Sequence, residues 1–157
     1  MKTILKFILL FGIVATIASG CTKKEETYYF KCKIDGVEFV ATSTESTLIT
    51  DGGLINGYKT DAITKKPSSI FLTAQELAIR GAGDYDIYSP GEATYNDENL
   101  ASWYLKSGKF TISKYNALKS QVTGSFKTII FTNSKGETRT ATDGTFYVKL
   151  TKDSDFI

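Results

Sequence analysis

The feature that most constrains this fold is a period-two alternation of apolar and polar residues, which Gly, Asp and Asn interrupt at intervals. Its clearest unit has apolar residues at every second position of 30–34 and again of 37–41, with Asp35-Gly36 between the two runs. Asp-Gly favours a type I′ turn, whose positive φ angles suit the twist of paired strands. We therefore predict a tight hairpin in which Ile34 lies opposite Val37 and both apolar rows share one face.

The same alternation continues to the end of the chain. Further strands are expected at 47–50, 54–59, 69–74, 85–88, 93–95, 102–106, 109–115, 122–131 and 140–150. Asp51-Gly52-Gly53 and Ser107-Gly108 are expected to be turns, and 75–82 to be a helical turn or an irregular crossover. Short strands separated by turn residues indicate an all-β fold. We expect a single antiparallel β-sandwich or flattened barrel of about ten strands, preceded by a signal-peptide helix.

One weak internal echo joins two of these strands. Gly124-Ser125-Phe126 resembles Gly144-Thr145-Phe146, and each triplet lies within a long expected strand. Glycine inside a strand often marks a bulge or a close approach of another group. The echo therefore predicts that the two strands bend over the same edge of the core.

The N-terminus has the three parts of a secretory signal. Lys2 and Lys6 are basic, 7–17 is apolar, and 18–20 are small residues suited to cleavage. This apolar run is short for a transmembrane helix, which needs about 20 residues. Cys21 follows at once, which resembles the lipobox of bacterial lipoproteins, where the cysteine thiol is acylated. We expect lipidation at Cys21; ordinary cleavage after residue 20 would instead leave a free thiol.

The signal divides the chain into residues 1–20, a lipidated tether over 21–27, and a β-domain over 28–157. Within the tether, Lys24, Glu25 and Glu26 resemble the export signal of surface lipoproteins in Bacteroidota-type bacteria. This implies a lipid anchor in the outer membrane, with the domain facing either the cell exterior or the periplasm.

Charge excludes one class of partner. Two of the 19 basic residues lie in the signal, so the basic residues of the mature chain balance its 17 acidic residues. Binding to nucleic acid requires clustered positive charge. A neutral domain without a long Lys/Arg run argues against nucleic acid as a partner.

Several short motifs, taken in order, resemble one known group. They are Phe-x-x-x-Ile-Asp-Gly-x-x-Phe at 30–39, Gly83-x-Tyr85, Gly-x-Phe-x-Ile at 108–112, and the Gly-Ser-Phe and Gly-Thr-Phe pair. Together they resemble the small Bacteroidota-type outer-membrane lipoproteins of unknown function. The resemblance implies a compact β-fold on an outer membrane and no particular activity.

Residue types limit the chemistry. The chain has no histidine, which removes His-activated nucleophiles and His-containing zinc sites. Cys32 is then expected to be a buried core residue, and Gly81-Ala82-Gly83 a turn rather than a dinucleotide loop. Asp84/Asp86 and Asp97/Glu98 are the remaining candidates for catalysis or calcium, and solvated acids explain them as well. We expect no cofactor, no metal and no enzymatic activity.

Aromatic residues provide the candidate binding site. Adjacent strand residues face opposite sides, so if Trp103 packs inward, Tyr104 faces outward, near Tyr95. Exposed aromatic rings suit sugars and proteins, although such rings also serve packing alone. We therefore predict a non-catalytic, lipid-anchored envelope protein that binds or scaffolds a glycan or surface protein through Trp103 and Tyr104. The alternatives are a carrier of a small apolar ligand in a β-barrel and, third, a carboxylate-based hydrolase.

Overall fold

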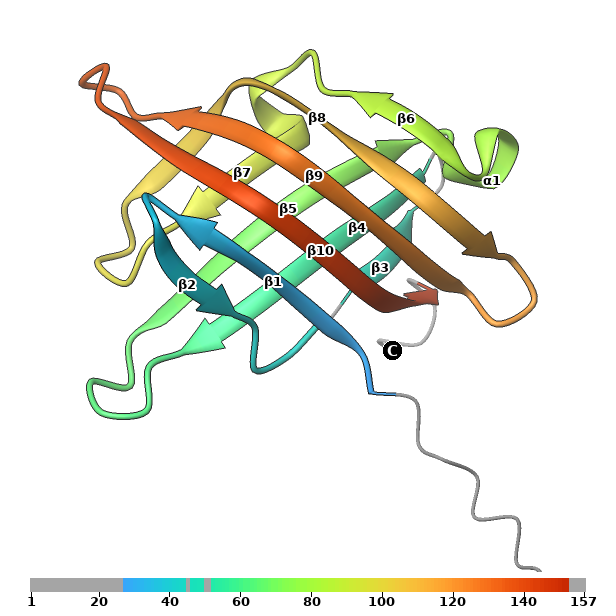
Figure 1. Cartoon of the computed structure of the whole chain (residues 1–157), viewed down its shortest axis with the longest axis horizontal. Helices are drawn as coiled ribbons and strands as arrows, with labels where there is room; N and C mark the ends of the chain where they lie inside the picture. Colours follow the sequence, from blue (N-terminus) through green and yellow to red (C-terminus); the bar gives the residue numbers. More distant parts are fainter. Residues whose placement is uncertain (1–26, 45, 50–51, 153–157) are drawn as a thin grey trace, which may run out of the picture.

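The computed structural model describes residues 27–44, 46–49 and 52–152. This part of the chain is almost entirely β-structure, as predicted (Figure 1). In chain order its elements are β1 (Tyr29–Ile34), β2 (Val37–Val40), β3 (Ser46–Ile49), β4 (Gly52–Thr60), β5 (Pro67–Gln75), α1 (Leu77–Arg80), β6 (Gly83–Asp86), a 3-10 turn (Pro90–Glu92), β7 (Ala93–Asn96), β8 (Ser102–Asn116), β9 (Gln121–Thr132) and β10 (Thr138–Lys152).

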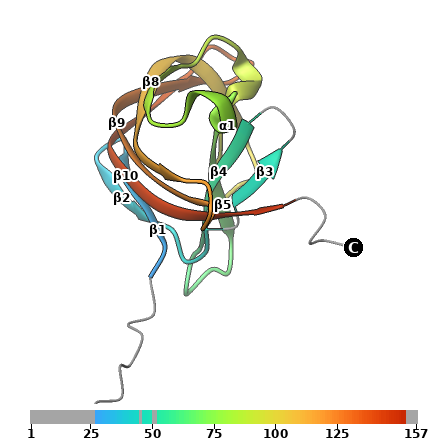
Figure 2. The same ribbon diagram turned by 90° about the vertical axis from the view of Figure 1, so that its right-hand side faces the viewer.

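All ten described strands belong to one sheet, which curls into a nearly closed barrel (Figure 2). The path β3-β4-β5-β7-β8-β9-β10 returns to its start because residues 150–152 of β10 pair with residues 46–48 of β3. That pairing is parallel, whereas the other strand pairs between described strands are antiparallel. Hairpins force only consecutive strands to be antiparallel, and β3 and β10 are far apart in the sequence. The flattened-barrel form of the prediction is therefore confirmed.

The predicted hairpin at 30–41 is confirmed as β1 and β2. Ile34 pairs with Val37. Asp35 and Gly36 have φ angles of 49° and 83°, as a type I′ turn requires. On β2, however, Phe39 is 4% exposed while Val37 is 70% exposed. Val37 directly follows the turn at the end of the barrel, where no other described strand covers it. The prediction that Val37 is buried in the same row as Phe39 is therefore wrong.

Two predicted turns are instead parts of strands. Residues 102–116 form one continuous strand, β8, so the hairpin predicted at Ser107-Gly108 is wrong. The pairing of β8 with β9 shifts register on both sides of these residues. Ile129 of β9 lies against Gly108 where a side chain would stand, and Ser107-Gly108 therefore marks a bulge. Likewise Gly52-Gly53 begins β4 instead of preceding it.

The echoed glycines and phenylalanines pair with each other across two strands. Gly124 of β9 lies opposite Phe146 of β10, and Gly144 of β10 lies opposite Phe126 of β9. A Cβ atom on either glycine would collide with the ring of the opposite phenylalanine. Each ring thus covers the bare backbone of its partner glycine, which confirms the predicted close approach at a shared core edge.

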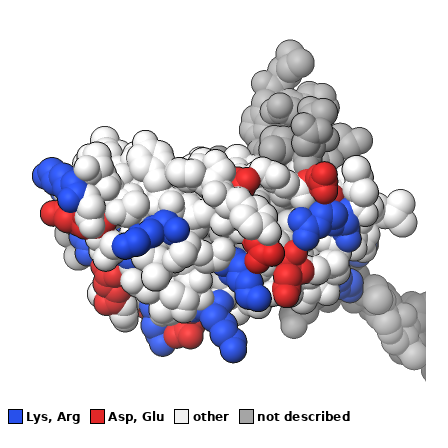
Figure 3. Space-filling model, turned by 90° about the horizontal axis from the view of Figure 1, so that it is seen from above, with Lys and Arg blue, Asp and Glu red and all other residues white. Residues whose placement is uncertain are grey.

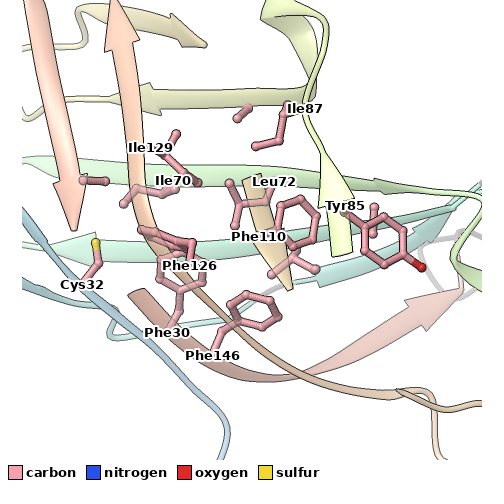
Figure 4. Close-up of a cluster of buried hydrophobic side chains, with 14 of the residues drawn as sticks. Phe30, Cys32, Ile70, Leu72, Tyr85, Ile87, Phe110, Phe126, Ile129 and Phe146 are labelled. Carbon is pink, nitrogen blue, oxygen red and sulfur yellow. The ribbon is translucent and has the colours of Figure 1, made fainter. Parts of the chain in front are cut away.

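The barrel interior is filled by aliphatic side chains and aromatic rings (Figure 4). Phe30 stacks on Phe146 with ring centroids 5.9 Å apart, and Tyr85 stacks on Phe110 at 5.4 Å. The segment 75–82, predicted as a helical turn or an irregular crossover, contains the helical turn α1, and its Leu77 is fully buried in the same core. Among the described residues, these buried side chains occupy the centre of the barrel, and the barrel form itself is compatible with either a binding or a carrier role.

Apart from Asp97, which is 9% exposed, the charged side chains of the described residues are at least partly exposed. On the face seen in Figure 3, basic and acidic groups are interspersed, and neither sign forms a large patch there. Among the residues that the structure describes, no helix is long and apolar enough to cross a bilayer.

Candidate functional site

A groove of about 290 Å³ lies at the end of the barrel where several hairpins turn. We call it the loop-end groove; it is bordered by the β1–β2 turn, the β4–β5 connection and the β7–β8 connection, all on the left of Figure 1. Its apolar lining includes Ile34, Phe39 and Tyr95. Its charged lining comprises five carboxylates and three cations: Asp35, Glu38, Asp61, Asp97, Glu98, Lys59, Lys66 and Arg139. The groove thus combines an apolar floor with polar walls of both signs.

An ion pair fixes the β1–β2 turn to β10 beside this groove. The Arg139 guanidinium donates to Asp35 Oδ2 at 2.7 Å, and the backbone N–H of Thr140 donates to Asp35 Oδ1 at 2.8 Å. Burial alone would raise the pKa of Asp35, but these two hydrogen bonds outweigh it and lower that pKa. The same hydrogen bond to Asp35 raises the pKa of Arg139. Asp35 is therefore held as a carboxylate.

Trp103 supports the β7–β8 connection, which forms another side of the groove. It is 5% exposed, so it packs inward, and its Nε1–H donates to Asp97 Oδ2 at 3.2 Å. Asp97 Oδ1 accepts from the backbone N–H groups of Asn99 and Ala101, at 2.9 and 3.0 Å. Arg139 lies over the indole ring, 5.0 Å from its centroid. These contacts make Trp103 a support for the β7–β8 connection.

The other predicted binding residue, Tyr104, faces outward on β8 and is 47% exposed. Its neighbours across the sheet are Thr94 and Thr132, so Trp103 and Tyr104 do not form one platform. The aromatic ring that lines the groove is Tyr95, which lies opposite Trp103 in the strand register. Burial first, and then the charge of Asp97, raise the pKa of Tyr95.

The loops around the groove also brace one another. Lys66 Nζ donates to Asn99 Oδ1 at 3.0 Å, which joins the β4–β5 and β7–β8 connections. Asp61 Oδ1 accepts from the backbone N–H groups of Thr64 and Ile63 at 2.6 and 2.9 Å. These hydrogen bonds, that of the Thr64 N–H foremost, lower the pKa of Asp61. The walls of the groove are therefore built from connected loops.

Two of the groove carboxylates, Asp35 and Asp61, have shifted pKa values. A general acid needs a carboxyl whose pKa is raised, and those of Asp35 and Asp61 are lowered. Asp84 and Asp86 lie elsewhere, on the outer face of β6, where they accept hydrogen bonds from Thr111 Oγ1 at 2.6 Å and Tyr88 OH at 3.2 Å. Within the described ranges, no three metal-ligating side chains gather into a possible metal site.

Sequence reasoning missed Arg139, which contacts both Asp35 and Trp103. Its residue type could have indicated a special role, because arginine is rare in this chain. Of the 19 basic residues, two are arginines, Arg80 and Arg139. Arginine has a planar fork of donors that suits a fixed carboxylate, whereas lysine does not. An isolated arginine among lysines is thus a candidate for a fixed ion pair.

The predicted lipidation and export residues, Cys21 and Lys24, Glu25 and Glu26, lie outside the described residues, as does the signal over 1–20. Comparison with known proteins gives no matching family model, no matching curated protein and no matching solved structure.

Proposed function

We propose that this chain is a non-catalytic, lipid-anchored envelope protein whose barrel binds a segment of glycan in the loop-end groove. The observation that carries the proposal is the partly exposed ring of Tyr95 in a groove that carboxylates and amines line. Sugars present hydroxyl groups that hydrogen-bond to such walls, and apolar C–H faces that pack on aromatic rings. A groove of about 290 Å³ is at the small end of the range for ligand sites, which suits one or two sugar rings.

Preorganisation supports the same proposal. Binding costs free energy when loops and side chains must become ordered around a ligand. Here the Asp35–Arg139 ion pair and the Lys66–Asn99 hydrogen bond already join the loops on both sides. Less ordering therefore remains for the ligand to impose.

The direction of β1 places the groove away from the tether. β1 begins at Tyr29, next to the tether, and ends at Ile34, which lines the groove. A six-residue strand spans about 20 Å. With a lipid on Cys21, the groove then opens away from the membrane, where a glycan can reach it.

One observation favours a surface protein as the second candidate ligand. Val37, Ile63 and Leu100, which are 70%, 91% and 73% exposed, each lie on a different turn at this end. Single exposed aliphatic residues are common on soluble proteins, but three around one groove resemble the rim of a protein contact.

The test uses the mature chain purified in detergent and a panel of envelope and extracellular polysaccharide fragments, with affinity measured by calorimetry. Glu38→Gln and Glu98→Gln should each weaken the tightest fragment about tenfold, the cost of one charged hydrogen bond. Glu76→Gln, beside α1 and outside the groove, is the matched control and should change nothing. Equal affinity in all variants would contradict the proposal. Capture of a protein instead, abolished by serine at Val37, Ile63 and Leu100, would replace glycan by the second candidate.

A further inference from the structure

A second groove, of about 330 Å³, lies on the outer surface at the other end of the barrel. Tyr29 and Tyr147 line it together with Lys114, Lys119 and the amide side chains of Asn116 and Gln121. Among the described residues that line it, none is Asp or Glu. This groove is therefore basic and aromatic, whereas the loop-end groove carries more acids than bases.

Three tyrosines cluster at the edge of this groove, where the tether joins the domain. The ring centroid of Tyr147 lies 5.0 Å from that of Tyr28 and 6.4 Å from that of Tyr29. Tyrosine has an apolar ring and a polar hydroxyl, so it is enriched where apolar and aqueous regions meet, as at membrane interfaces. The cluster is suited to the head-group level of a bilayer.

The turn between β8 and β9 projects beside these tyrosines. It carries Leu118, which is 100% exposed, and Lys119 follows it. Gln121 Nε2 donates to the Tyr28 hydroxyl at 3.1 Å, which places the base of the turn next to the tether junction. An exposed leucine flanked by lysine and tyrosine is the combination found in segments that lie at a membrane surface.

The length of the tether limits how far this end can move from an anchor. Seven residues, 21–27, lead from Cys21 to Tyr28. At about 3.3 Å per residue they reach roughly 20 Å when fully extended. A lipid on Cys21 would therefore keep Tyr28 within roughly 20 Å of the bilayer.

We infer that the tether-end surface, defined as Tyr28, Tyr29, Lys114, Leu118, Lys119 and Tyr147, docks on the membrane that holds the anchor. Lys114 and Lys119 bind anionic lipid head groups, the tyrosines lie at head-group depth, and Leu118 enters the acyl boundary. The inference rests on the lipid anchor of the proposed function. It adds a fixed orientation, in which the loop-end groove points away from the membrane.

The test places a fluorescent probe at each end of the lipidated protein in vesicles. Leu118→Cys and, as the matched control, Ile63→Cys are each labelled with an environment-sensitive maleimide dye. Cys32 does not compete because burial raises the pKa of its thiol to about 12, and the sulfur of Cys21 is occupied by lipid. On phosphatidylcholine vesicles that contain phosphatidylglycerol, the dye at 118 should brighten severalfold and be quenched by lipid-borne spin labels. The dye at 63 should keep its aqueous emission.

A second variant examines the role of the charges. Lys114→Gln with Lys119→Gln should return most of the emission at 118 toward the aqueous value, as should vesicles of phosphatidylcholine alone. Aqueous emission at both 118 and 63, in protein that floats with the vesicles, would overturn the docking inference and leave the anchor intact. Protein that fails to float at all would instead overturn the anchor, and with it the inference. The changes at Leu118, Lys114 and Lys119, which lie outside the loop-end groove, should leave glycan affinity unchanged.

Discussion

The two ends of the barrel differ in charge and in construction. The loop-end groove is lined by five carboxylates and three cations, and hydrogen bonds join the loops around it. The groove at the tether end is lined by two lysines, two tyrosines and uncharged polar residues. Residues 21–157 carry equal numbers of basic and acidic residues, so their net charge does not reveal this difference between the ends. The proposals above rest on that difference between the two ends.

The largest effect should come from removing the proposed lipid anchor at the tether end, which should change membrane attachment and leave the loop-end groove unaltered. Cys21→Ser should release the protein from membranes completely, because an acylated cysteine is the expected attachment. Fractionation of cells measures this, and globomycin should make the unprocessed precursor of the unmodified protein accumulate. Ligand affinity at the loop-end groove should stay unchanged. Membrane-bound Cys21→Ser protein would show that something other than a lipid holds the domain.

The shared core should affect both ends together. Phe146 is fully buried, stacks on Phe30 and covers Gly124. Phe146→Ala should lower the free energy of unfolding by about 3 to 5 kcal/mol. Urea unfolding measures this, and Tyr104→Ala, at an exposed aromatic, is the control, with a change within about 0.5 kcal/mol. Equal losses in the two variants would mean that the core is not packed as described.

The ion pair at the loop end should give a smaller effect, confined to that end. Asp35→Asn removes the charge that Arg139 and the Thr140 N–H recognise, and should cost about 1 kcal/mol, since the pair is partly exposed. Because the folded pKa of Asp35 is lowered, its contribution is fully present above the ordinary aspartate pKa, near 4. It is lost as pH falls through the lower folded pKa.

The matching measurement is urea unfolding of both proteins at neutral pH and at several values below pH 4. The difference between wild type and Asp35→Asn should shrink as pH falls. Asp143→Asn, which breaks the exposed Lys33–Asp143 pair, should leave the free energy of unfolding unchanged within error. A difference that grows toward low pH would contradict the assigned direction of the Asp35 pKa.

The smallest effect concerns the reactivity of Cys32 on β1, the strand that connects the tether end to the loop-end groove. Cys32 is 4% exposed, and burial raises the pKa of its thiol to about 12. Its reaction with a maleimide at pH 8 should therefore be slow in the folded protein and fast in urea. Rapid labelling without denaturant would show that β1 separates readily from the barrel, so that the ends are not rigidly connected.

Local features of the fold could be predicted from the sequence, and features that depend on distant partners could not. Asp35-Gly36 specifies its own turn, and the alternation in 30–34 specifies its buried face. Ser107-Gly108 was misassigned because glycine suits a turn and a bulge alike, and only the approach of Ile129 distinguishes them. The loop-end groove was not foreseen, because it brings Asp35, Asp97 and Arg139 together from three parts of the chain.

Trp103 shows the same limit at the level of one residue. The alternation correctly predicts that Trp103 and Tyr104 face opposite sides, and the structure shows that Trp103 is the one that packs inward. It could not show that the indole would support Asp97, because that contact depends on how the β7–β8 connection folds back over β8. Tyr95, named only as a neighbour of Tyr104, is the aromatic residue that lines the groove.

The most direct test of the central claim is to map amide chemical-shift changes by NMR when the tightest glycan fragment is added to the isotopically labelled mature protein in detergent micelles. The proposed function predicts that the largest changes fall in 35–39, 59–68 and 95–99, with little change near Tyr29, Lys114 and Tyr147. Changes centred on those three residues, with the loop-end groove unaffected, would contradict it.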